Sequence, residues 1–272
     1  FGYGIIPAMG IKGIAFATIT AQFIGMSYII YKAYLTDLKK YLYPDCFLPK
    51  FALIKDLLIQ GIPVSLGMMM ISIGIYIIQN FISNFGDLAF AGYGTAARYE
   101  QIYILPILGL STAVLSIAGQ SFGAKNYLRV KHSYYYAIFY GTTIMIIAGL
   151  IIFFSADKIV NIFTNNVVVI SYGTIYLKIS ALIFPTYPIY FISNGFFMAL
   201  KKATYAMNLN IIRNVLLPVP TILLASYIGG SFKNFFWSYC LFNWVFAILL
   251  LVFVSIYIKN KININNQINR LL

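Results

Sequence analysis

Four ionisable residues stand inside long apolar stretches of the chain: Arg98, Glu100, Lys178 and Arg213. A charge inside a bilayer is costly unless it is paired or hydrated, so such residues mark candidate ion or substrate pathways. Glu100 and Lys178 lie at similar depths in their stretches, which allows a Glu100–Lys178 ion pair. The alternative for Arg98 and Glu100 is that both reach the nearer membrane surface. We interpret Arg213 as structural, either extending to the interface or neutralising helix carbonyls.

Uncharged side chains near these positions could line a cavity for organic cations. Thioethers adapt to varied apolar ligands and tyrosine faces attract cations, which favours the Met68–Met70 run and Tyr76. Neighbouring helix positions point in different directions, so the run cannot all face one cavity, and ordinary helix packing is the alternative. The candidate cavity residues are Met69, Ser72, Tyr76, Asn80, Arg98, Glu100, Gln101, Lys178 and Asn194.

Enzymatic chemistry is not supported by the residues present. Catalysis would require paired carboxylates, a metal cluster or a nucleophile with its base. The sequence has one histidine, His132, and its two cysteines, Cys46 and Cys240, show no metal-ligand spacing. We therefore expect a protein that is not an enzyme, with no catalytic residue and no metal site.

The composition indicates which elements must position these residues. Of the 272 residues 61% are hydrophobic and only 9% are charged, whereas soluble domains carry about 25% charged residues. A membrane helix needs about 20 apolar residues, and seven stretches meet this length. They are 13–34, 60–83, 98–119, 134–154, 172–197, 206–228 and 235–258. The net charge of +13 does not indicate nucleic-acid binding, because the basic residues are scattered singly.

The numbers of basic residues differ strongly between the two sets of alternating loops. One set of loops and helix ends holds 13 of the 19, and the opposite set holds Lys12, Lys158 and Lys233. Cytoplasmic loops carry the excess of Lys and Arg, which predicts a cytoplasmic C-terminus. The 13 are Lys32, Lys39, Lys40, Lys50, Lys55, Lys125, Arg129, Lys131, Lys201, Lys202, Lys259, Lys261 and Arg270.

Prolines interrupt several of the predicted spans. Each removes a backbone hydrogen bond and kinks a helix, which allows hinges for alternating access, although membrane helices also tolerate kinks without function. The pair Pro185 and Pro188 favours a bend in the middle of its span. The candidate hinge or structural residues are Pro63, Pro106, Gly119, Gln120, Gly123, Pro185, Pro188 and Arg213.

Four segments resemble the multidrug and toxic compound extrusion (MATE) family. In 94–125 the family pattern is carried by Ala96-Ala97-Arg98, Leu105-Pro106 with Gly109, and Gly119-Gln120 with Gly123-Ala124. Gly61-Ile62-Pro63 is similar to the Gly-x-Pro that opens the family's second lobe. Residues 10–22 resemble the entry to the last helix of the first lobe, and Asn194-Gly195 with the following basic loop is a weaker match.

The resemblance implies an all-α membrane protein of about seven transmembrane helices, the last six forming one lobe of a two-lobe transporter. Residues 1–34 would hold the last helix of the N-terminal lobe, 35–59 a cytoplasmic linker, 60–258 the C-terminal lobe and 259–272 a cytoplasmic tail. The chain begins at Phe1 without a basic region typical of signal peptides, so we expect a part of a longer polypeptide.

By this resemblance the chain is the C-terminal half of a cation-coupled multidrug efflux antiporter in the inner membrane of a cell. Its partners would be the N-terminal lobe, the bilayer and small amphipathic or cationic substrates. The zone after Pro63 lacks the acid that some branches carry, so Na⁺ or H⁺ coupling is expected in the N-terminal lobe. The alternatives are a lipid-linked-precursor flippase of the same superfamily or a truncated subunit that does not transport.

Overall fold

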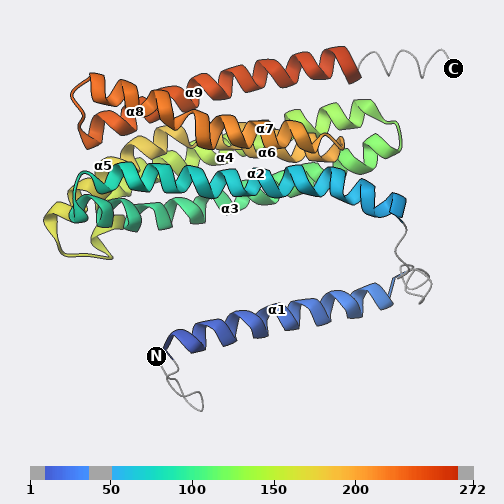
Figure 1. The fold of residues 1–272 in the computed structure, drawn as a ribbon, viewed down its shortest axis with the longest axis horizontal. Helices are drawn as coiled ribbons and strands as arrows, with labels where there is room; N and C mark the ends of the chain where they lie inside the picture. The colour runs from blue at the N-terminus through green and yellow to red at the C-terminus, as the bar shows by residue number, and fades with distance from the viewer. Residues whose placement is uncertain (1–9, 37–50, 263–272) are drawn as a thin grey trace. The chain divides into compact units, whose positions relative to one another are not determined.

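The computed structural model describes residues 10–36 and 51–262, and these ranges are helical throughout apart from short turns (Figure 1). The chain divides into two compact units, 1–56 and 57–272, with α1 (Gly10–Tyr34) in the first. The other elements are α2 (Phe51–Ser83), α3 (Asp87–Gly123), α4 (Tyr127–Asn161), α5 (Val167–Ile183), α6 (Thr186–Ala199), α7 (Ala203–Ile211), η3 (Ile212–Leu216), α8 (Pro218–Tyr227), α9 (Phe232–Tyr257) and η4 (Ile258–Ile262).

The predicted all-α membrane architecture is confirmed. Among the described residues five helical segments are long and apolar enough to cross a membrane: α2, α3, α4, Ala203–Tyr227 and Phe232–Asn260. The bent pair α5 and α6 makes a sixth span when it is counted as one. The predicted first span is helical as α1 but is not among these six. Most of the predicted linker, 37–50, lies outside the described residues, and α2 already begins at Phe51.

The fifth predicted span is broken where its proline pair predicts a bend. α5 and α6 meet at an angle of 56° next to Pro185. Pro185 has no backbone N–H for the carbonyl of Ala181, and α5 ends beside it at Ile183. The carbonyl of the neighbouring Leu182 accepts a hydrogen bond from the Trp244 indole Nε1 of α9 at 3.0 Å. A neighbouring helix therefore satisfies the backbone that the bend exposes.

A second proline explains the π-helical turn η3 between α7 and α8. Pro218 cannot donate to the carbonyl of Asn214, and the preceding N–H of Leu217 bonds instead to the carbonyl of Ile212 at 2.8 Å. This wider turn changes the direction in which side chains project, and such turns recur at functional sites. Arg213 stands on this turn.

The connections of the 57–272 unit alternate between two ends of the bundle. Figure 1 shows the turns α2–α3, α4–α5 and α8–α9 at one end and the turns α3–α4 and α6–α7 at the other. At the α3–α4 turn the left-handed residue is Lys125, with φ of 56°, rather than a glycine. The Gln120 side chain bonds Ser116 Oγ at 3.5 Å, and backbone groups close the turn.

The interior of the bundle is built around α3, α5 and α6. α3 packs against α4, α5 and α6, while α9 packs against α5, α6 and α8. Tyr134, Phe184, Phe196, Phe197 and Phe235 are fully buried there. Polar residues sit within this aromatic core, and they form the site described below.

Replacing Gly74 with Val is expected to destabilise the bundle. A Cβ at Gly74 of α2 would lie 2.4 Å from the backbone oxygen of Asn214 on η3, which cannot rotate away. Overpacking of this kind costs about 1–3 kcal/mol. Unfolding of the purified chain in mixed micelles would measure the loss.

The matched control is Gly61→Val on the same helix, where an added Cβ meets nothing within 4 Å. It should change the unfolding free energy by no more than about 0.5 kcal/mol. Equal effects of the two substitutions would show that α2 does not make its close contact with η3.

Candidate functional site

Glu100 of α3 lies in the interior of the bundle, with 8% of its surface exposed. Its carboxylate accepts hydrogen bonds from the hydroxyls of Tyr176 on α5 and Tyr187 on α6. The two donors come from opposite sides of the α5–α6 break. Because the span is broken, its two parts, α5 and α6, each contribute one tyrosine hydroxyl to the same carboxylate.

Arg213 is equally buried, with 7% exposed, and is surrounded by aromatic rings. Its guanidinium carbon is 4.1 Å from the ring centre of Tyr190, 4.9 Å from that of Tyr187 and 5.9 Å from that of Phe191. Its Nε donates to Asn243 Oδ1 of α9 at 3.4 Å. Cation–π contacts with several rings stabilise a guanidinium away from water. Arg213 is therefore held by α6 and α9 rather than extended to the membrane surface.

Tyr187 joins the two charged groups, because its hydroxyl donates to Glu100 while its ring faces Arg213. Both charges line one cavity of about 210 Å³. Its polar lining also includes Gln79 of α2, Gln101 of α3 and Asn214 of η3. The cavity thus offers a carboxylate, a guanidinium and amide groups within an otherwise apolar bundle. Such a set can hold a cation at the carboxylate or exchange a proton there.

A second cavity of about 230 Å³ lies between α2, α3, α6 and α7. It is mostly apolar, with Met68, Tyr190 and Phe191 in its wall and Asn194 and Asn210 as its amide groups. Phe191 lines both cavities. Apolar walls with a few placed polar groups are typical of small-molecule sites.

A hydrogen-bond network orients the polar wall of this second cavity. Tyr190 donates its hydroxyl hydrogen to Asn210 Oδ1, and Asn194 Nδ2 donates to the same oxygen at 3.1 Å. Asn214 Nδ2 donates to the Tyr190 hydroxyl at 3.1 Å. Because Tyr190 also stacks on Arg213, the network connects the two cavities.

The structure brings together some of the predicted cavity residues. Glu100 and Gln101 line the first cavity, and Asn194 lines the second. The residues not lining either one are Met69, Ser72, Tyr76, Asn80, Arg98 and Lys178. Met69 and Tyr76 are 52% and 68% exposed on α2. Their predicted role in lining a cavity for organic cations stays a prediction.

The predicted Glu100–Lys178 ion pair is wrong. Lys178 Nζ lies 3.1 Å from Asp157 Oδ2 of α4, and the two side chains are 40% and 65% exposed. Similar depth in two spans does not place two side chains on facing surfaces. Lys178 projects towards α4, whereas Glu100 projects towards the tyrosines of α5 and α6.

Sequence reasoning missed the residues that hold the two charges. These are Tyr176, Tyr187, Tyr190 and Asn243, together with Asn210, which accepts the hydroxyl hydrogen of Tyr190. The sequence feature that could have indicated them is the presence of polar side chains within apolar spans, because such side chains require hydrogen-bond partners inside the bilayer. The tyrosines are too numerous in this chain, at 23, to stand out by type alone.

Comparisons with known proteins agree with this architecture. The MatE family model matches residues 63–224. The probable multidrug resistance protein YpnP of Bacillus subtilis is 28% identical over 85% of this chain and 53% of its own length. The probable multidrug resistance protein NorM of Thermotoga maritima is 28% identical over 67% of this chain and 39% of its own length. The chain thus spans about half the length of the curated relatives it matches.

Solved structures show the same fold. A MOP-superfamily transporter from Pyrococcus furiosus, whose binding pocket is described as reversed in polarity, superposes with a TM-score of 0.84 at 22% identity over 92% of this chain and 57% of its own. A MATE transporter in its outward-facing conformation gives a TM-score of 0.84 at 23% identity, with the same coverage. Because the family model covers more than half of the residues, the chain belongs to the MatE family of multidrug and toxic compound extrusion transporters.

Proposed function

We propose that the chain is the C-terminal lobe of a cation-coupled multidrug efflux antiporter that works by alternating access. The observation that carries the proposal is the buried carboxylate of Glu100 beside a cavity in a membrane-spanning bundle. A carboxylate inside a membrane span is energetically costly, which favours a role in cation or proton movement. The relatives' description as multidrug resistance proteins supports a drug-like substrate.

In this proposal the two cavities have different roles. The mostly apolar cavity with Met68, Tyr190 and Phe191 accepts part of an amphipathic substrate, and Glu100 takes up a proton or Na⁺ next to it. The network through Tyr190 connects the two. A further coupling carboxylate in the N-terminal lobe, the expected partner, remains part of the proposal. A flippase for anionic precursors receives less support, because Arg213 is the only cation among the described residues that line either cavity.

The charge distribution supports an orientation with the C-terminus in the cytoplasm. The α3–α4 and α6–α7 connections and the C-terminal end of α9 lie at one end of the bundle in Figure 1. These connections, the first turn of α4 and η4 contain Lys125, Arg129, Lys201, Lys202 and Lys259. The last turn of α4 contains Lys158 and the first turn of α9 contains Lys233, and these turns belong to the opposite end of the bundle. We propose a multi-pass protein of the cell (inner) membrane with its basic end inside.

Binding of a cationic dye tests the proposal without requiring transport. Ethidium is expected to bind the chain reconstituted in nanodiscs and to be displaced by Na⁺ or by acid at constant ionic strength, because the cations compete or couple at Glu100. Cells that express only residues 1–272 should not export the dye, since one lobe cannot enclose a central cavity. Dye binding that neither Na⁺ nor acid changes would contradict coupling in this lobe. Export by the chain alone would contradict the two-lobe arrangement.

A further inference from the structure

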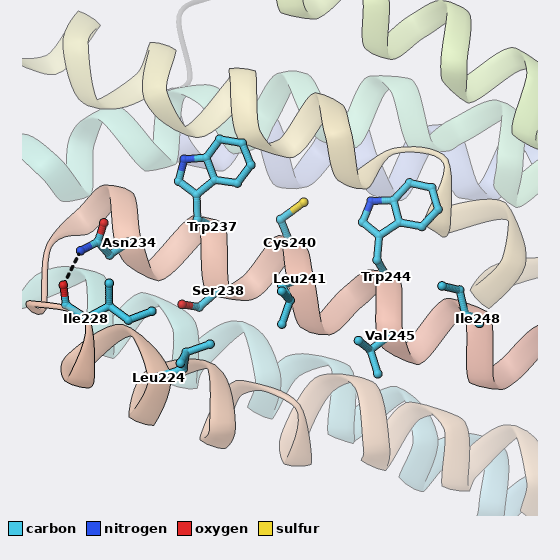
Figure 2. A pocket seen from close by; sticks show the side chains of 10 residues that line it. All are labelled: Leu224, Ile228, Asn234, Trp237, Ser238, Cys240, Leu241, Trp244, Val245 and Ile248. Atoms are coloured by element: carbon cyan, nitrogen blue, oxygen red, sulfur yellow. Dashed lines mark hydrogen bonds between the residues drawn. The ribbon is translucent and has the colours of Figure 1, made fainter.

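An open groove of about 620 Å³ runs between α8 and α9, apart from the two cavities of the candidate site. Figure 2 shows Leu224 of α8 and Ile228, which follows α8, facing Leu241 and Val245 of α9 across it, with Trp237 and Trp244 along one side. Its volume is in the range of ligand pockets. Both walls belong to segments that are long and apolar enough to cross a membrane.

The two tryptophans in this groove are the only ones in the chain. Trp237 is 48% exposed and Trp244 39% exposed. Trp244 is fixed in orientation by its bond to the carbonyl of Leu182, and its ring forms a rigid wall. An aromatic wall held by the protein backbone gives the groove a defined shape rather than a surface of mobile side chains.

One end of the groove has a polar lining residue, Asn234, and a single positive charge lies next to it in the sequence. Lys233 is exposed one helical turn before Trp237, and no other charged residue occurs between Pro218 and Ile258. Asn234 Nδ2 donates to the carbonyl of Ile228 at 3.0 Å and closes the turn beside it (Figure 2). An exposed lysine above an apolar groove at the membrane surface complements a phosphate headgroup above an acyl chain.

The dimensions fit one lipid chain. From Trp237 to Ile248 the α9 wall rises by about 16 Å at 1.5 Å per residue, which matches half of the hydrocarbon core of about 30 Å. A second helix is a poorer fit, because close helix packing in membranes uses small residues. The lining contains one such residue, Ser238, and it contains neither glycine nor alanine.

We propose that this groove binds one acyl chain of an anionic phospholipid, with Lys233 contacting the headgroup phosphate. The bound lipid lies in the leaflet at the α8–α9 turn. It covers the apolar surface of Leu241, Val245 and Ile248 on α9. This surface lies next to Trp244, which bonds to the broken α5–α6 span at the carbonyl of Leu182.

Tryptophan fluorescence reports on the groove directly, because both tryptophans line it. The chain is reconstituted in phosphatidylcholine nanodiscs that contain a minor fraction of brominated phosphatidylglycerol or of brominated phosphatidylcholine. Bromine quenches indole fluorescence on contact. We expect the fraction of grooves occupied by the anionic lipid to be about five-fold higher than its mole fraction in the bilayer. One lysine near the membrane surface provides a preference of this size. Lys233→Gln should abolish this difference, and the matched Lys158→Gln at the same end of the bundle should retain it.

A groove-filling variant, Leu224→Phe with Val245→Phe, separates occupancy of the groove from general contact with the bilayer. It should reduce quenching by both brominated lipids. Equal quenching by the two lipids in the unchanged chain would overturn the proposal, as would quenching that neither Lys233→Gln nor groove filling alters. Absence of quenching by either lipid would show that a second copy or another protein segment covers the groove, which also overturns the proposal.

Discussion

Glu100→Gln is expected to remove the response of the protein's stability to cations. Glutamine has nearly the same shape as glutamate. Its carbonyl oxygen can accept the hydroxyl hydrogen of one of the two tyrosines, Tyr176 or Tyr187, and its NH2 group can donate to the hydroxyl oxygen of the other. The variant should therefore fold. It loses the negative charge that a bound Na⁺ or proton would neutralise in the 210 Å³ cavity.

The expected size of this effect follows from linkage. A ligand at 100 times its dissociation constant stabilises the folded state by about 2.7 kcal/mol. Thermal unfolding of the unchanged chain in detergent should shift upwards as Na⁺ is added at fixed pH and ionic strength. Glu100→Gln should remove this shift. In the complete two-lobe transporter the same substitution should abolish dye export.

The matched control is Asp157→Asn, which removes an acidic charge from an accessible ion pair with Lys178. Exposed pairs contribute about 0–1 kcal/mol, so this variant should keep the cation response. A cation response that survives in Glu100→Gln, or one that Asp157→Asn also abolishes, would exclude Glu100 as the cation site of this lobe.

The placement of these groups shows how far the sequence could predict the structure. Apolar lengths predicted the membrane helices, because every backbone polar group in a bilayer must be bonded within its own helix or to a neighbour. The proline pair at 185 and 188 likewise predicted the break between α5 and α6, because proline removes a donor wherever it occurs. Both are local properties of the chain.

The partners of the charges could not be predicted in this way. Glu100 accepts hydrogen bonds from Tyr176 and Tyr187, which are 76 and 87 residues away in the sequence. Whether these side chains point towards one another depends on the rotation of α3, α5 and α6 about their helix axes. Depth along a span is readable from sequence, but rotation is set by packing. The predicted Glu100–Lys178 pair was wrong because the two residues lie at similar depths but project from sides of α3 and α5 that do not face each other. Arg213 was found as a buried charge, yet its aromatic enclosure depends on the π-helical turn that Pro218 produces.

Arg213→Lys is expected to destabilise the protein even though it keeps the charge. The planar guanidinium lies between 4.1 and 5.9 Å from three ring centres while its Nε donates to Asn243. A lysine ammonium is more strongly hydrated and lacks the planar fork, so it cannot stack on several rings and reach the same acceptor. The loss of desolvated cation–π contacts, of about 2 kcal/mol, and of a charged hydrogen bond predicts a decrease of about 2–4 kcal/mol in unfolding free energy.

Arg213→Met separates packing from charge at the same position. Methionine fills much of the space between Tyr187, Tyr190 and Phe191, but it leaves the Asn243 acceptor without this donor and Glu100 as the only charge lining the cavity. We expect a similar loss of stability together with tighter binding of cations, because a cavity with an uncompensated carboxylate attracts them more strongly. As a control, Arg98→Lys on the exposed face of α3 should change the unfolding free energy by no more than about 0.5 kcal/mol.

If Arg213→Lys unfolds like the unchanged chain, the aromatic enclosure does not hold Arg213. If Arg213→Met leaves cation binding unchanged, Arg213 and Glu100 do not act on the same ligand.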